Sequence, residues 1–110
     1  MIMIVELQRK NSEYPDLSLN KPYFIIGIEA DDYRLLNNDG KPYLYPSVLF
    51  KVINPEEPTD WISEYGEDGE RYAYPAVLNS TGFFEDFFEH NPEATRLFWQ
   101  EVNQRLAIAA

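Results

Sequence analysis

A motif that occurs twice constrains the fold of this chain more than any other feature of its sequence. The stretch 39–49 reappears 29 positions later as 68–78, and seven of the eleven aligned residues are identical, in the pattern Asp-Gly-x-x-Tyr-x-Tyr-Pro-x-Val-Leu. Asp-Gly favours a tight turn, the alternating tyrosines favour a short strand, and the proline favours the start of a helical turn. Each copy therefore predicts a turn, a strand and a single helical turn in that order.

The origin of the repeat is open. The pattern is either an internal duplication or the same local arrangement of turn, strand and helical turn used twice. Solenoid repeats of this period need at least three copies, and the chain has two. Residues two apart on a strand share a face, so each copy places two tyrosines together. These four rings either form an exposed interface or fill the core of a small domain. They are Tyr43, Tyr45, Tyr72 and Tyr74.

The first half of the chain is rich in short β-strand patterns. The strongest is 23–29, Tyr-Phe-Ile-Ile-Gly-Ile-Glu, and its apolar character predicts a central strand. Gly27 within it indicates a bulge or a close approach of another group to the backbone. Further strands are expected at 3–7, 33–36, 43–45 and 50–53, with a long loop after the first and a hairpin turn at 37–40.

The second half of the chain is acidic and changes from strands to helices. Residues 55–58 form an acidic, proline-rich connector, and Thr59-Asp60-Trp61-Ile62 predicts a helix cap with one or two helical turns. The second copy of the motif follows. Phenylalanines at 83, 84, 87 and 88 then predict an amphipathic helix, and Asn91-Pro92 predicts the start of a final helix. The apolar face expected for that helix comprises Ala94, Leu97, Phe98, Val102, Leu106 and Ala109.

The net charge of −10 is concentrated in one stretch. Residues 54–93 hold eleven acids and one base, whereas residues 1–53 hold seven acids and six bases. Nucleic-acid binding needs clustered Lys and Arg, so this balance argues against it. A field of one sign favours a basic partner, although the same charge also serves solubility alone.

The residues required for most enzyme chemistry are missing from this sequence. There is no Cys and a single His, His90, so neither a thiolate site nor a multi-histidine metal site is expected. No phosphate-binding glycine loop or nucleophile motif is present. We therefore expect a protein that is not an enzyme and has no cofactor. The nineteen acids leave a glycosidase-like pair of carboxylates open as an alternative. No stretch is long enough for a membrane span, and the short apolar start lacks a basic flank, which favours an unprocessed cytoplasmic protein.

The order of elements in residues 3–53 resembles an SH3-like barrel. In that fold a Pro-Ser turn separates the fourth strand from the short fifth, and the matching residues here are Gly40, Tyr45, Pro46, Ser47, Phe50 and Val52. Peptide-binding members of the fold carry a paired-tyrosine motif near the first strand, and here only Tyr14-Pro15 weakly resembles it. The whole chain also resembles small bacterial proteins, some of them similar to SH3-like immunity proteins of toxin systems. The resemblance implies a mainly β (α+β) domain over residues 1–110, with an SH3-like barrel at 3–53 and a connector, hairpin and packed helical annex at 54–110.

Two functions from different classes are compatible with these features. The first is a non-catalytic interaction module, of the immunity-inhibitor kind, whose acidic stretch 54–93 binds a basic protein such as a toxin enzyme. The second is an SH3-like adaptor that binds a peptide or small ligand in an aromatic groove around Tyr43 and Tyr45. The residues expected to contact the basic partner are Glu56, Glu57, Asp60, Trp61, Glu67, Asp68, Glu70, Tyr72 and Tyr74. For Trp61 the alternative is that it joins the annex to the barrel.

Overall fold

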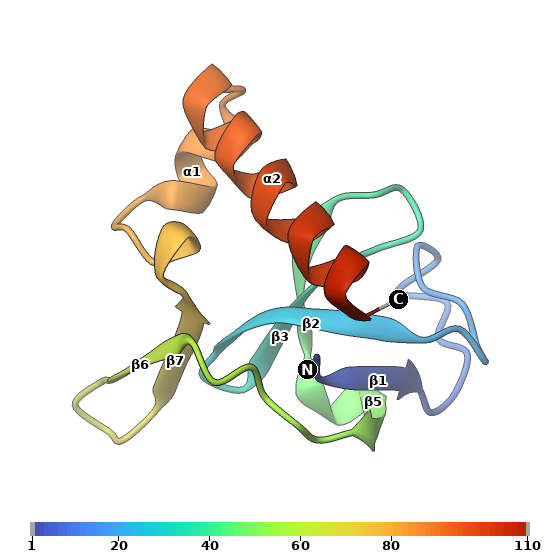
Figure 1. Ribbon diagram of the computed structural model, residues 1–110. Helices are drawn as coiled ribbons and strands as arrows, with labels where there is room; N and C mark the ends of the chain where they lie inside the picture. Colours follow the sequence, from blue (N-terminus) through green and yellow to red (C-terminus); the bar gives the residue numbers. More distant parts are fainter. Residues whose placement is uncertain (1, 110) are drawn as a thin grey trace.

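The computed structural model describes residues 2–109, with side chains through residue 107, and it is mostly antiparallel β-sheet with two C-terminal helices (Figure 1). The predicted α+β class is confirmed. Within the described residues the strands are β1 (Ile4–Leu7), β2 (Tyr23–Glu29), β3 (Asp32–Leu36), β4 (Pro42–Pro46), β5 (Phe50–Asn54), β6 (Trp61–Tyr65) and β7 (Arg71–Pro75). Short 3-10 turns occupy Ser47–Leu49 and Ala76–Leu78, and the helices are α1 (Phe83–Phe88) and α2 (Pro92–Ala109).

The sheet runs in the order β4-β3-β2-β1-β5, with every neighbouring pair antiparallel. β7 pairs with the end of β2 at Ile28 and Glu29, and β6 pairs with β7. β4 and β5 are the two ends of the main path and, across the described residues, no ladder joins them. The strands predicted for residues 3–53 are therefore present, but the sheet is not closed and an SH3-like barrel is not confirmed.

β2 organises the interior because its two faces serve two different apolar clusters. Tyr23 and Ile25 lie in the first cluster, and Ile26 lies in the second. The ladder between β2 and β3 shifts register between Ile25 and Gly27, which is the bulge predicted from the glycine. The buried members of the first cluster are Met3, Val5, Leu7, Leu17, Tyr23, Ile25, Leu35, Tyr45 and Phe50.

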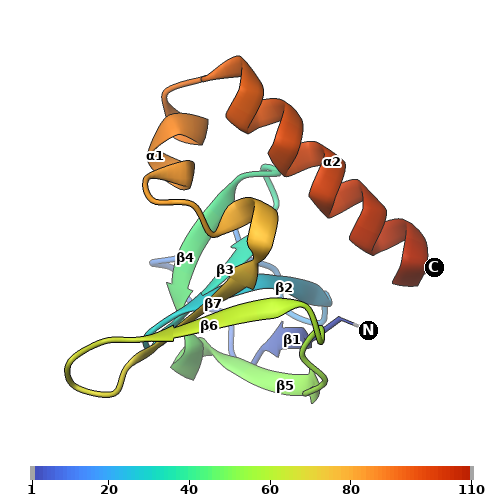
Figure 2. The same cartoon turned by 60° about the vertical axis from the view of Figure 1, so that its left-hand side comes forward.

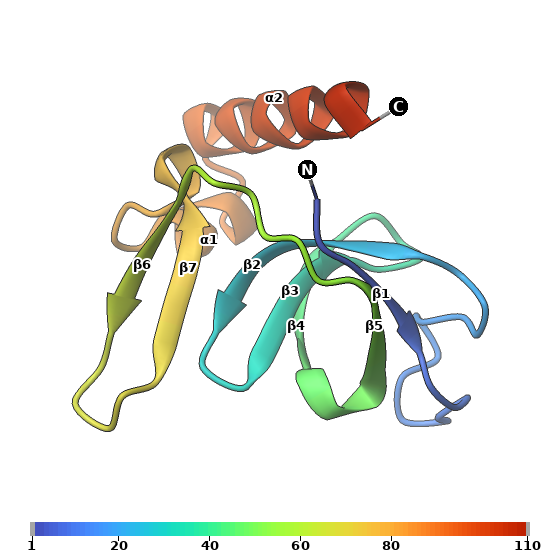
Figure 3. The ribbon, with the colours of Figure 1, turned by 60° about the horizontal axis from the view of Figure 1, so that its bottom comes forward.

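The two helices cover the other face of β2 and β7 (Figure 3). The amphipathic helix was predicted correctly, although Phe88 at its end is exposed. The Asn91 side chain accepts a hydrogen bond from the Ala94 N–H at 3.0 Å, as expected for a helix cap worth about 1 kcal/mol. Neither helix in the described part of the chain has the length and apolarity to cross a membrane. The second cluster comprises Ile26, Tyr74, Leu78, Phe83, Ala94, Phe98 and Val102.

Two predictions for the helical half need correction. Leu106 was placed on the packed face of α2 but is exposed, and the side chain of Ala109 lies outside those described. The helical turns predicted at Thr59–Ile62 are absent, because Trp61–Tyr65 forms strand β6 instead. The segment Trp-Ile-Ser-Glu-Tyr carries aromatic and β-branched residues and pairs regularly with β7 across an Asp-Gly turn. Pairing with a neighbouring strand outweighs a local capping preference.

Both copies of the repeated motif adopt the predicted local structure. Gly40 and Gly69 have positive φ angles of 73° and 81° in their turns, which favours glycine at both positions. Pro46 and Pro75 each end a strand and are followed by a 3-10 turn. The motif therefore builds the same turn, strand and helical turn twice.

Candidate functional site

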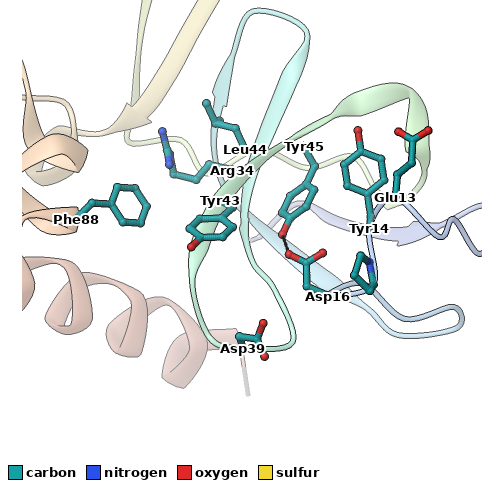
Figure 4. A pocket seen from close by; sticks show the side chains of 10 residues that line it. Glu13, Tyr14, Asp16, Arg34, Asp39, Tyr43, Leu44, Tyr45 and Phe88 are labelled. Carbon is teal, nitrogen blue, oxygen red and sulfur yellow. Dashed lines mark hydrogen bonds between the residues drawn. The ribbon is translucent and has the colours of Figure 1, made fainter.

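An open groove lies where the long loop after β1 meets β4 and the end of α1 (Figure 4). Aromatic rings line it from three separate segments: Tyr14 from the loop, Tyr43 and Tyr45 from β4, and Phe88 from α1. Carboxylates accompany the rings, and their residues are Glu13, Asp16 and Asp39. The groove therefore combines apolar faces with negative charge.

The Tyr45 side chain is held in the groove by hydrogen bonds and by packing. Its hydroxyl donates a hydrogen bond of 2.5 Å to Asp16 Oδ2, and Asn37 Nδ2 donates to both of these oxygens at 3.1 Å. Burial raises the pKa of Tyr45 strongly, and the hydrogen bond to Asp16 raises it further. Tyr14 packs edge-on against the Tyr45 ring, with 5.8 Å between ring centroids. The loop that carries Tyr14 and Asp16 is thus held onto β4.

Tyr43 and Phe88 form the more exposed part of the groove. Their ring centroids are 5.7 Å apart, and their exposed fractions are 39% and 42%. Leu44 beside them is 36% exposed. These groups offer apolar surface that a bound segment would bury, since exposed aromatic rings carry large contact area at little cost in conformational entropy.

Arg34 also lines the groove, and its charge is paired within the chain. It is only 6% exposed, and its Nη2 forms an ion pair with Glu29 at 2.7 Å. Its Nε donates to the Tyr74 hydroxyl at 2.6 Å, and its guanidinium lies 3.8 Å from the centre of the Phe84 ring. Arg34 therefore ties β3, β7 and α1 together, and its ion pair is with Glu29 rather than with a carboxylate of the groove.

The residues predicted to bind a basic partner fall into different environments. Tyr74 is buried, with its hydroxyl donating to Glu29 at 2.6 Å, and Trp61 is half-buried against the first cluster. The packing of Trp61 on the first cluster fits the alternative considered for it, in which it joins the two halves of the chain. Placing Tyr74 on a binding surface was wrong, because its ring fills the space above Gly27.

Two of the predicted carboxylates are engaged in ion pairs. Glu57 accepts two hydrogen bonds from Arg71, at 2.6 and 2.8 Å, and Asp60 pairs with Arg105. The pKa of each carboxyl is lowered, chiefly by the hydrogen bond from its arginine. Their negative charge is therefore largely matched within the chain.

The remaining predicted residues lie on the β6–β7 hairpin or beside it. Glu56, Glu67 and Asp68 are exposed, whereas Glu70 and Tyr72 are half-buried. Glu67, Asp68 and Glu70 share the hairpin turn, where a Glu70 carboxylate oxygen accepts the Asp68 N–H at 3.0 Å. The structure thus brings three of the predicted carboxylates together at the tip of this hairpin.

Sequence reasoning missed several residues of both surfaces. In the groove it identified Tyr43 and Tyr45 but not Asp16 or Phe88, which reach β4 only through folding of the long loop and of α1. On the hairpin it missed Glu64 and Tyr65, both exposed on β6. The aromatic and β-branched residues of 61–65 were the available signal for that strand.

Two further observations concern metal binding and similarity to known proteins. Among the described residues no three His, Asp or Glu side chains are grouped so as to hold a metal ion. Comparison of the chain with protein-family models, with curated proteins and with solved structures gives no match.

Proposed function

We propose that this protein is a non-catalytic interaction module whose groove binds an extended peptide segment of a partner protein. The observation that carries the proposal is the meeting of four aromatic rings, from three segments of the chain, with three carboxylates in one open groove. Such a surface suits a segment in which proline or other apolar residues stand next to Lys or Arg.

Each part of the groove has a role in this proposal. Tyr43 and Phe88 supply the apolar faces, since both rings are exposed and already packed together. Glu13 and Asp39 attract the basic side chain, because opposite charges steer association and select against acidic segments. Tyr45, fixed by Asp16, keeps the floor of the groove in one conformation. The element order shared with SH3-like barrels also supports a peptide ligand.

The test uses a labelled peptide rich in proline and arginine, with fluorescence anisotropy as the readout. Replacing Tyr43 or Phe88 with Ala should weaken binding about tenfold or more, as expected for a central aromatic contact. Val48→Ala is the matched control, because the apolar Val48 side chain is 80% exposed but lies in the 3-10 turn after β4, outside the groove. If all three variants weaken peptide binding equally, or if none does, the groove is not the peptide-binding site.

The acidic hairpin supports a second candidate function, that of an immunity-type inhibitor of a basic toxin enzyme. The observation that favours it is that Glu67 and Asp68 are exposed together at the hairpin tip and belong to no ion pair of the described residues. Exposed carboxylates retain their field for a basic partner.

This candidate is testable with a panel of small basic nucleases. The variant with Glu67, Asp68 and Glu70 replaced by Lys should associate more slowly and show a weaker dependence on salt. The Glu85→Lys, Asp86→Lys, Glu89→Lys variant is a control of equal charge change on α1 and its C-cap. An unchanged association rate in the hairpin variant would eliminate charge steering by this surface.

A further inference from the structure

The outer edge of β6 is open. Within residues 2–109, β6 pairs only with β7, and its residues 62–65 are all exposed. The β6–β7 hairpin extends away from the other strands, with β6 on its outer side (Figures 2 and 3). A further strand therefore has unobstructed access to β6.

The backbone groups that β6 presents outward follow from its register with β7. Trp61 lies opposite Pro75, which has no N–H, and Gly66 beyond the strand donates its N–H to the Glu70 carbonyl. Bonded and non-bonded pairs alternate in an antiparallel ladder, so Ile62 and Glu64 bond to β7. Ser63 and Tyr65 then direct their N–H and C=O groups away from β7. This gives two donors and two acceptors along one free edge.

β6 lacks the features that protect the other two edges of the sheet. β4 begins at Pro42 and ends at Pro46, and β5 carries Lys51. Proline and lysine are common means of preventing unwanted strand pairing. β6 contains neither residue, and its ladder with β7 has no bulge. Its edge is thus suited to pairing.

The charge around β6 determines what can pair with it. Glu64 lies on the strand, and Glu67, Asp68 and Glu70 lie in the turn that follows. A second copy of this chain would bring the same carboxylates against one another, which is unfavourable for directly opposed like charges. A segment with Lys or Arg meets opposite charge instead. The exposed Tyr65 ring gives an apolar contact on the face opposite Glu64.

We propose that β6 accepts an extended segment of a partner protein, in which Lys or Arg alternates with apolar residues, as an added strand of the sheet. This inference rests on the second candidate function, the acidic hairpin as a binding surface, and specifies how the hairpin binds. Main-chain hydrogen bonds to Ser63 and Tyr65 provide affinity. Glu64 on one face and the Tyr65 ring on the other select alternating basic and apolar side chains.

The probe is a synthetic peptide in which Lys and Val alternate, and the direct readout is amide hydrogen exchange by NMR. In the free protein the amides of Ile62 and Glu64 should exchange slowly and those of Ser63 and Tyr65 rapidly. The peptide should slow exchange at Ser63 and Tyr65. The Val residues stand opposite Ser63 and Tyr65 when the Lys residues share the face of Glu64. A peptide N-methylated at each Val has the same charge but lacks the donors directed at β6, and it should bind about tenfold more weakly.

The matched variants are Ser63→Pro and Ser63→Ala. Both remove the hydroxyl that accepts a hydrogen bond from Arg71 Nε at 3.0 Å, but only the proline removes the outward N–H. Ser63→Pro should weaken peptide binding about tenfold, and Ser63→Ala less than about twofold. The peptide comparison needs no variant and holds even if Ser63→Pro fails to fold.

The outcomes separate strand addition from charge attraction alone. Equal binding of both peptides, with no protection at Ser63 and Tyr65, would overturn strand addition while the acidic hairpin remained a binding surface. If neither peptide binds, both strand addition and the acidic hairpin as a binding surface are overturned. Self-association of the native chain through β6, seen as protection at Ser63 and Tyr65 that increases with protein concentration, would replace the basic segment with a second copy.

Discussion

The two copies of the repeated motif share their local structure but differ in what surrounds them. Each has a glycine turn, a strand and a proline-initiated 3-10 turn, and in each the second tyrosine is buried and donates to a carboxylate. Tyr45 belongs to the first apolar cluster and Tyr74 to the second. The motif therefore provides one buried tyrosine anchor for each core.

The difference between the copies lies in their neighbours. β4 stands at an edge of the sheet, and its Tyr45 bonds to Asp16 from a loop. β7 lies between β6 and β2, and its Tyr74 bonds to Glu29 on β2 and Arg34 on β3. A local motif thus determines the turn and the strand, whereas tertiary neighbours determine which groups bond to each buried tyrosine hydroxyl and how much stability it provides.

The largest expected effect comes from Gly27, which only the second copy requires. A Cβ at this position would overlap the Tyr74 ring, so Gly27→Ala forces the ring or β2 to move. We expect a loss of about 3 kcal/mol in the free energy of unfolding, at the upper end of the range for overpacking. Urea denaturation monitored by circular dichroism measures it.

Gly40→Ala and Gly69→Ala are the controls for that measurement. Both glycines have positive φ, and an added Cβ meets nothing within 4 Å at either position. Each should cost about 1 kcal/mol, for the left-handed backbone alone. A Gly27→Ala loss no larger than these two would mean that the Tyr74 ring is not fixed against β2.

Removing the Tyr74 hydroxyl should cost more stability than removing the Tyr45 hydroxyl, so the second copy again shows the larger effect. Tyr74→Phe leaves Arg34 Nε, on a residue only 6% exposed, without its acceptor and should cost about 2 kcal/mol. Tyr45→Phe leaves Asp16 half-buried and still bonded to Asn37, so about 1 kcal/mol is expected. Thermal and urea unfolding of both variants gives the comparison. A larger loss for Tyr45→Phe would reverse our ranking of the two environments.

The same features explain what could be predicted from the sequence. The turns of both motif copies, the strands within residues 3–53 and the bulge at Gly27 follow from residues close in the chain, and they were predicted correctly. Helical turns were predicted at Thr59–Ile62 because Thr59-Asp60 resembles a cap, but Asp60 pairs with Arg105, 45 positions away, and Trp61–Tyr65 forms β6. The groove was predicted only through Tyr43 and Tyr45, because Tyr14 and Phe88 approach them from distant segments. Contacts of this range have no local sequence pattern.

Alkaline pH should change stability by a smaller amount, and this change tests the burial of Tyr45 and Tyr74. Burial is the main cause that raises the pKa of both Tyr45 and Tyr74 above the usual value of about 10. In the unfolded chain these hydroxyls ionise near their usual pKa, so stability is complete below about pH 10 and falls as pH rises further. Phenolate absorbance should show both tyrosines ionising only on unfolding. Tyr45→Phe and Tyr74→Phe should each flatten the decline in stability above pH 10, and an unchanged slope would contradict the burial argument.

The smallest effect concerns a contact that only the second copy makes. Arg71 occupies the position that Pro42 holds in the first copy, and it binds Glu57 through two hydrogen bonds. The pair is about one-third exposed, so Glu57→Gln should cost no more than about 1 kcal/mol. The pKa of Glu57 is lowered in the folded state, so this stability is present above its unfolded pKa of about 4.3 and declines as pH falls. Native and Glu57→Gln proteins should therefore converge in stability on acidification from pH 6. A difference that persists at low pH would assign the loss to packing of the side chain, because protonation would already have removed the ion pair.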